Sequence, residues 1–145
     1  MTTLGAVETT TLAEAMGMTQ ELGDAIARIA AEELEGGRPE AARTILDGLV
    51  VTNPRDGLAW ALLSRVHRAL GQPLAGRFCA EVAFKLAPDE PAAMLVRAEE
   101  LLREPGERSL GLELMASLSS LAGAAGDRAR ALLAAAAPTG ASADP

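Results

Sequence analysis

Gly37-Arg38-Pro39 is followed 34 residues later by Gly71-Gln72-Pro73, and Pro54 is followed at the same spacing by Pro88. A glycine at such a point ends one helix, and the proline two residues on begins the next, because proline is tolerated in the first turn of a helix. Pro54 and Pro88 close each unit. Self-similarity at this period predicts helix-turn-helix repeats, which bury their apolar faces by stacking on their neighbours.

The residues between these glycines and prolines match the tetratricopeptide repeat in register. In the second unit Trp60 takes its aromatic position, Leu63-Ser64 its large and small pair, and Gly76 and Ala83 its small positions. The same positions of the first unit hold Ile26, Ile29-Ala30, Ala42 and Leu49. We therefore predict an all-α fold: a tetratricopeptide-repeat solenoid of about three repeats.

The repeat domain is expected over residues 11–137, with repeats at about 23–56, 57–90 and 91–124. An N-terminal helical segment precedes them, and Thr19 is expected to cap the first long helix. The third turn, Pro105-Gly106, comes one residue late for the period. Asp127 is expected to cap a last helix, 127–137, that closes the solenoid. Residues 1–10 are expected to be flexible, and the Gly/Ala/Ser/Pro-rich residues 138–145 to be disordered.

Composition limits the classes of function. The 145 residues are 49% hydrophobic, which suits one core, and the net charge of −7 comes with no basic stripe. Electrostatic binding to nucleic acid or to an anionic membrane is therefore not expected, and a neutral, apolar or mildly basic partner is. The longest apolar run, Ala131 to Ala137, is too short to span a membrane. The start has no secretory signal pattern and Cys79 is alone, so we expect a cytoplasmic location.

No set of residues that could perform catalysis emerges from the sequence. His67, the single histidine, takes the usual Tyr position of the repeat and is expected to pack. Cys79 is interpreted as a small buried hydrophobic residue. Adjacent acids such as Glu99-Glu100 point about 100° apart on a helix, so they are not an acid/base pair. We expect no enzyme, no cofactor and no metal site.

The register also predicts which residues line a groove for a partner. The first helix of each repeat faces inward through its second, fifth, sixth, ninth and twelfth positions, which include Arg28, Arg68 and Ala92. That several of these residues simply pack between helices stays open as an alternative. The candidate groove residues are Ala27, Ala31, Leu34, Leu58, Ala61, Leu62, Arg65, Leu95, Val96, Glu99 and Leu102.

One common kind of tetratricopeptide groove is excluded by three of these positions. Domains that grip the C-terminal carboxylate of heat-shock chaperones need Lys and Asn in the groove. Here Ala27, Ala31 and Leu62 stand at those positions. None of the three side chains has a hydrogen-bond donor for a carboxylate.

Three short segments carry a more specific resemblance. Thr11-Leu12 through Gly17-Met18-Thr19, Arg68-Ala69-Leu70-Gly71-Gln72 and Ala98-Glu99-Glu100-Leu101-Leu102, in this order, resemble the class II chaperones of bacterial type III secretion systems over residues 11 to 135. The resemblance implies an all-helical bacterial chaperone that holds an apolar translocator protein in its concave groove before export. This chain departs from the family where grooves usually carry Tyr and Phe, since it has Ala, Leu and Arg there.

Two other functions remain open beside this one. The first is the co-chaperone class that holds the needle subunit of the same machines by an amphipathic helix, and the second is a tetratricopeptide adaptor unrelated to secretion. The resemblance also implies a homodimer formed through the N-terminal region. The apolar residues for such a contact are Leu12, Met16 and Met18, which could instead fold back on the first repeat.

Overall fold

The structure, a computed structural model, describes residues 10–136. The segments expected to be flexible or disordered, 1–10 and 138–145, lie outside this range except for Thr10. Within the range the chain forms eight α-helices and no β-strand, which confirms the all-α prediction. The helices are α1 (Leu12–Ala15), α2 (Gln20–Glu35), α3 (Pro39–Thr52), α4 (Gly57–Ala69), α5 (Pro73–Leu86), α6 (Pro91–Arg103), α7 (Arg108–Ser119) and α8 (Ala124–Ala136).

The turns at Gly37 and Gly71 have the same local cause. Both glycines are left-handed, with φ of 79° and 75°, a conformation that disfavours residues with a Cβ. Pro39 and Pro73 are the first residues of α3 and α5. The Thr19 hydroxyl accepts a 3.1 Å hydrogen bond from the Leu22 N–H and so caps α2. These helix ends follow from local sequence alone.

The last helix begins earlier than expected. The chain turns at Gly123, whose φ is 98°, and α8 starts at Ala124. The Asp127 N–H already bonds the Gly123 carbonyl at 3.0 Å, so Asp127 lies in the first turn and is not the cap. Its carboxylate pairs with Arg130 one turn on. The prediction that Asp127 begins this helix was therefore wrong by three residues.

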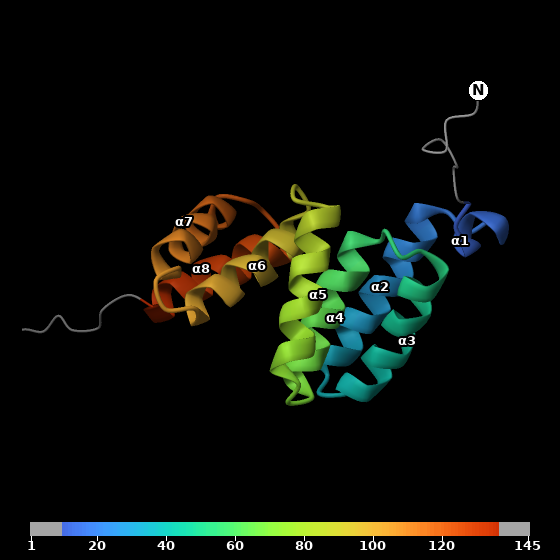
Figure 1. Ribbon diagram of the computed structural model, residues 1–145, viewed down its shortest axis with the longest axis horizontal. Helices are drawn as coiled ribbons and strands as arrows, with labels where there is room; N and C mark the ends of the chain where they lie inside the picture. The colour runs from blue at the N-terminus through green and yellow to red at the C-terminus, as the bar shows by residue number, and fades with distance from the viewer. Residues whose placement is uncertain (1–9, 137–145) are drawn as a thin grey trace, which may run out of the picture.

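The helices form two groups (Figure 1). Helices α2 to α5 stand side by side, while α6, α7 and α8 lie crosswise at the other end of the molecule. Helix α6 packs on both α4 and α5 and joins the groups, and α8 folds back to contact α6 as well as α7. No helix within residues 10–136 combines the length and the apolar character that crossing a membrane requires.

Three buried clusters follow this arrangement. The first joins α2, α3 and α4 through large side chains such as Leu46, Leu49 and Leu63. The last joins α6, α7 and α8 around Met115 and Leu118. The cluster between them is composed of small residues apart from one valine: Ala61, Ala80, Ala83, Ala93 and Val96. The fully buried side chains are therefore smaller where the two groups meet than inside either group, and Trp60 packs against them half-buried.

Candidate functional site

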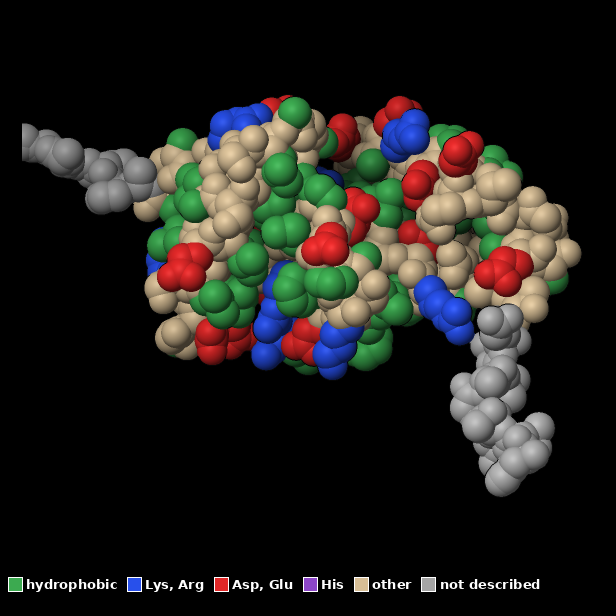
Figure 2. All heavy atoms as spheres, turned by 90° about the horizontal axis from the view of Figure 1, so that it is seen from above, with side chains coloured by type: hydrophobic (Ala, Val, Ile, Leu, Met, Phe, Trp, Pro, Cys, Tyr) green, Lys and Arg blue, Asp and Glu red, His purple; other side chains and the backbone are tan. Residues whose placement is uncertain are grey.

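A cavity of about 790 Å³ opens on the side formed by α2, α4, α6 and α8, and we call it the groove. Seen from above, the surface is hollowed between the two halves of the molecule, with hydrophobic and charged side chains at the border of the hollow (Figure 2). Twelve of its eighteen lining residues are apolar. The lining consists of Arg28, Ala31, Glu35, Leu58, Ala61, Leu62, Arg65, Glu90, Pro91, Ala92, Leu95, Val96, Ala122, Ala124, Ala125, Asp127, Arg128 and Ala131.

The groove wall contains seven of the eleven residues expected from the repeat register. These residues come from the first helix of each repeat, as the register requires, since α2, α4 and α6 follow one another along the wall. They are Ala31, Leu58, Ala61, Leu62, Arg65, Leu95 and Val96.

Four expected residues are not in the wall. Ala27 is fully buried in the cluster between α2, α3 and α4. Leu34 and Leu102 are half-buried against the first and the last cluster. Glu99 turns toward α8, where its carboxylate pairs with Arg128 at 3.2 Å. The three apolar residues thus pack between helices in this structure.

The residues that line the groove differ in how exposed they are to a ligand. Leu62, Leu95 and Val96 are only 7%, 4% and 3% exposed, so they belong to the core as much as to the groove. Leu58 and Ala92 are half-buried, and the alanines at the start of α8 reach the surface. Substitutions that probe the groove therefore belong at the exposed positions, because a charge at a core position would also unfold the protein.

Helix α8 is the part of the groove that the sequence did not predict. The segment from the turn before it through its second turn contributes Ala122, Ala124, Ala125, Asp127, Arg128 and Ala131. The neighbouring face, with Ala129, Leu132 and Leu133, packs on α6 and α7. Alanine-rich helices have little contrast between their faces, so no signal in this segment marked one face as a groove wall.

The groove contains charged side chains of both signs, and only some of them are paired within the protein. Arg128 forms an ion pair with Glu99, and Asp127 forms one with Arg130. In contrast, the side chains of Arg28 and Arg65 make no ion pair or hydrogen bond with any residue between 10 and 136. Arg65 is half-buried at this position. A half-buried guanidinium without a partner loses part of its hydration and gains no ion pair in return. A carboxylate on a partner would supply that ion pair.

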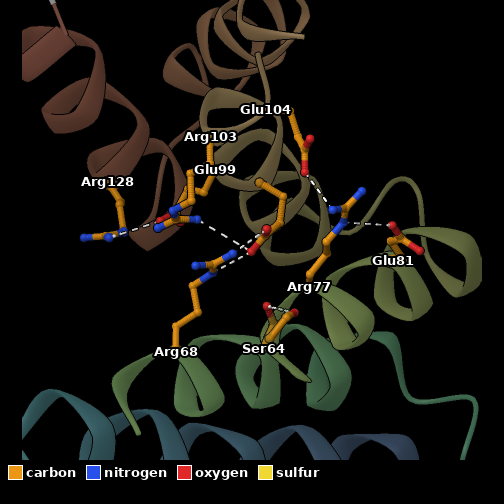
Figure 3. A network of polar contacts seen from close by, with 10 residues as sticks. Ser64, Arg68, Arg77, Glu81, Glu99, Arg103, Glu104 and Arg128 are labelled. Carbon is orange, nitrogen blue, oxygen red and sulfur yellow. Dashed lines mark hydrogen bonds and ion pairs between the residues drawn. The ribbon is translucent and has the colours of Figure 1, made fainter. Parts of the chain in front are cut away.

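A network of ion pairs beside the groove ties α6 to α4 and α5 (Figure 3). Arg68 grips Glu100 with two bonds, Nε to Oε1 at 2.6 Å and Nη2 to Oε2 at 2.5 Å, and the Glu100 side chain is only 5% exposed. Arg77 binds Glu104 at 2.8 Å across the same junction. The register placed Arg68 in the groove, but it instead joins the second repeat to the third.

A smaller polar cavity of about 150 Å³ lies where α1 and α2 meet the start of α4. Asp56 in its wall is buried, and it accepts a 3.0 Å bond from the Ala59 N–H, which caps α4. Burial raises the pKa of Asp56, the negative charge of Asp24 adds to this effect, and the bond from Ala59 opposes it. The site is a helix cap with a buried charge.

Cys79 packs in the first cluster as expected, whereas His67 is half-buried and has a polar neighbour. His67 Nδ1 lies 2.7 Å from Gln72 Oε1 at the turn between α4 and α5. Cys79 is buried, and burial raises the pKa of its thiol to about 11, so the reactive thiolate is disfavoured near neutral pH. Among residues 10–136 no three His, Cys, Asp or Glu side chains are grouped so as to hold a metal ion.

The three residues expected at a dimer contact divide into two kinds. Leu12 and Met16 are 48% and 67% exposed on and just after α1. Met18 is half-buried and packs against the cluster between α2, α3 and α4. Of the two possibilities open from the sequence, Met18 therefore folds back on its own chain, while Leu12 and Met16 remain available.

The fold and the groove define this chain as an all-helical repeat protein with an apolar groove on the side of its first helices. Its structure resembles that of SycD, a type III secretion translocator chaperone of Yersinia enterocolitica, with a TM-score of 0.63 over 88% of this chain and 99% of SycD. The two sequences are 19% identical in this comparison, so the likeness establishes a common fold. No protein-family model and no curated protein matches the sequence.

Proposed function

We propose that this protein is a bacterial cytoplasmic chaperone that binds an apolar segment of a secreted translocator in the groove and keeps it soluble before export. The observation behind the proposal is the groove itself, which is largely apolar and is built from the first helices of three repeats together with α8. Burying one Leu or Val of a client contributes roughly 1.5–3 kcal/mol. A few such anchors give useful affinity after the cost of ordering the client.

The shared fold with SycD and the segment resemblance favour a secretion chaperone over an unrelated adaptor. The action is stoichiometric binding and not catalysis. It needs no cofactor, because the groove provides apolar area and a few charges. The aromatic residues usual in such grooves are missing from this wall, so a client must supply the large side chains itself.

Co-purification from the native host tests this function. The groove variant is Ala131→Trp, which puts a large side chain at an exposed wall position of α8. The matched control is Ala116→Trp, at an exposed position of α7 outside the groove. We expect the wild-type chain and the control to retain one apolar secreted protein, and Ala131→Trp to lose it with an unchanged helical circular dichroism spectrum.

The identity of the retained protein separates the candidates. A large protein with membrane-spanning stretches supports the translocator, and a short helical subunit supports the needle co-chaperone. Retention of proteins unrelated to secretion would leave the general adaptor. Equal retention by Ala131→Trp and Ala116→Trp would show that the groove is not the binding site.

We propose further that the chain dimerises through its N-terminal region. Leu12 and Met16 support this, since both are exposed large apolar side chains, one on the short helix α1 and the other just after it. In light scattering, Met16→Glu is expected to halve the mass of a dimeric wild-type protein. A dimer mass retained by this variant would remove Met16 from the interface.

A further inference from the structure

Helix α2 has a second apolar face besides the one that it buries. Its buried residues, Gly23, Ala27 and Ala30, lie on the side that packs against α3 and α4. Leu22 and Ile29 are instead 50% and 52% exposed. Seven residues make about two turns of a helix, so these two side chains share one face, opposite Ala27. We call it the outer face of α2.

The outer face lies at the uncovered end of the repeat stack. Within residues 10–136, α2 packs on α3 and α4 and on no other helix. At the opposite end of the stack, α8 covers the third repeat by packing on α6 and α7. The end faces of a repeat solenoid are usually polar, because they meet water. Two large apolar side chains on such a face therefore indicate a contact with a partner.

Two exposed side chains of opposite charge flank the outer face. Glu21 directly precedes Leu22, and Arg28 directly precedes Ile29, so both charges lie on the same flank. Neither side chain forms an ion pair or hydrogen bond with any residue between 10 and 136. They are about 10 Å apart along the helix axis, too far to pair with each other. Each is therefore available to a charge on a partner.

The order of these residues makes the outer face self-complementary. Ala25 lies between Leu22 and Ile29 on the same side of the helix. If two copies of α2 cross antiparallel at Ala25, Leu22 of each copy lies level with Ile29 of the other. Glu21 of each copy likewise lies level with Arg28 of the other. A two-fold interface requires such a pattern, because each of its contacts occurs twice, and a small residue at the crossing lets the helix axes approach closely.

We propose that a second copy of this chain binds the outer face of α2. The two α2 helices pack antiparallel through Leu22 and Ile29, and Glu21 of each subunit pairs with Arg28 of the other. This inference rests on the proposed dimerisation. It adds the helix at the centre of the contact, the symmetry of the contact and two ion pairs between the subunits.

Light scattering of the full chain tests the apolar part of the contact. Ile29→Glu puts a charge at the centre of the interface and should halve the mass of the dimeric wild-type protein, with an unchanged helical circular dichroism spectrum. Leu74→Glu is the matched control, because Leu74 is an exposed leucine on α5, and this variant should remain a dimer. A dimer retained by Ile29→Glu, or a monomeric wild-type protein, would overturn the proposal.

Charge reversal tests the symmetry. Glu21→Arg alone, or Arg28→Glu alone, places like charges opposite each other at both ion pairs. At low ionic strength each should raise the dissociation constant of the dimer about 10-fold or more. The double variant restores opposite charges and should regain the wild-type dissociation constant. An equimolar mixture of the two single variants should form heterodimers, because one subunit then has two acidic side chains and the other has two basic ones.

A double variant and a mixture that both dimerise as poorly as the single variants would remove the antiparallel arrangement. If Met16→Glu becomes monomeric while Ile29→Glu stays dimeric, the N-terminal dimer stands on the segment around α1 and the interface on α2 falls. None of these results bears on the chaperone function, which co-purification of the client with Ala131→Trp and its control tests separately.

Discussion

At the scale of single residues, Asp56 is one of two charged residues between 10 and 136 that are buried, the other being Glu100. Asp56 is 5% exposed, and its carboxylate caps α4 and lies near Asp24. Asp at such a cap is favourable because it accepts an N–H bond. Burial works against the ionised form and raises the pKa of Asp56. The Asp56 side chain therefore stabilises the start of α4, but burying its ionised carboxylate lowers the stability of the folded protein at neutral pH.

The pH dependence of stability tests this balance. Because the pKa of Asp56 is higher in the folded protein than in the unfolded chain, the folded state binds the proton more tightly. The stability that Asp56 gains from this tighter proton binding is therefore present at low pH and is lost as the pH rises through the folded pKa. Asp56→Asn keeps a capping oxygen but cannot ionise. In urea unfolding, the stability of Asp56→Asn relative to wild type should rise from mildly acidic to neutral pH.

Asp56→Ala is the control for the cap itself. It should lose about 1 kcal/mol at acidic pH, where the wild-type carboxyl is protonated, because the bond to the Ala59 N–H disappears. A difference between Asp56→Asn and wild type that does not vary with pH would contradict the buried-charge account.

At the scale of helices, local sequence predicted the helix ends at Gly37 and Gly71 but neither the start of α8 nor all of the faces. Gly71 and Pro73 fix a helix end and a helix start through backbone conformation, which depends on neighbouring residues only. The side of α8 that faces the groove depends on how it packs on α6 and α7, which its alanines do not encode. Ala27 was misplaced for a related reason, since a small side chain fits either a core or a wall.

Close helix packing in the third repeat gives a prediction at this scale. A Cβ on Gly111 of α7 would lie 3.0 Å from both the Ala98 carbonyl oxygen and the Leu102 nitrogen, which are backbone atoms of α6. Gly111→Ala should therefore push α7 away and lower the free energy of unfolding by about 1–3 kcal/mol. The measurement is urea denaturation followed by circular dichroism.

Gly48→Ala is the matched control. Gly48 is exposed within α3, and a Cβ there meets nothing within 4 Å. Alanine should raise stability by up to about 1 kcal/mol at this position, because it favours the helix more than glycine does. If both substitutions stabilise the protein, the contact between α6 and α7 is looser than the structure shows.

At the scale of the whole molecule, the junction between the two groups of helices controls the groove, because α2 and α4 lie on one side of it and α6 and α8 on the other. The junction buries mainly alanines and is held by the Arg68 and Glu100 pair. Repeat proteins gain stability from such interfaces between neighbours. The 34-residue period predicted the stacking, but not the ion pairs that cross this interface.

Weakening this junction should uncouple the two groups during unfolding. Glu100→Ala removes the partner of Arg68 and breaks a pair that is nearly buried on one side, which costs about 3 kcal/mol. The single tryptophan, Trp60, lies on α4, where its ring contacts that of Phe78 on α5 and its Nε1–H donates a 2.7 Å bond to the Pro54 carbonyl, so its fluorescence reports mainly on the α2 to α5 group. Circular dichroism reports on all helices. In wild type we expect the two urea transitions to coincide.

In Glu100→Ala the circular dichroism signal should begin to fall at lower urea than the Trp60 fluorescence changes, because α6, α7 and α8 then unfold first. Arg43→Ala breaks the exposed pair with Asp47 on α3 and is the control, since such a pair contributes less than about 1 kcal/mol and does not cross the junction. Its two transitions should still coincide. Coincident transitions in Glu100→Ala as well would mean that apolar contacts alone couple the two halves of the groove.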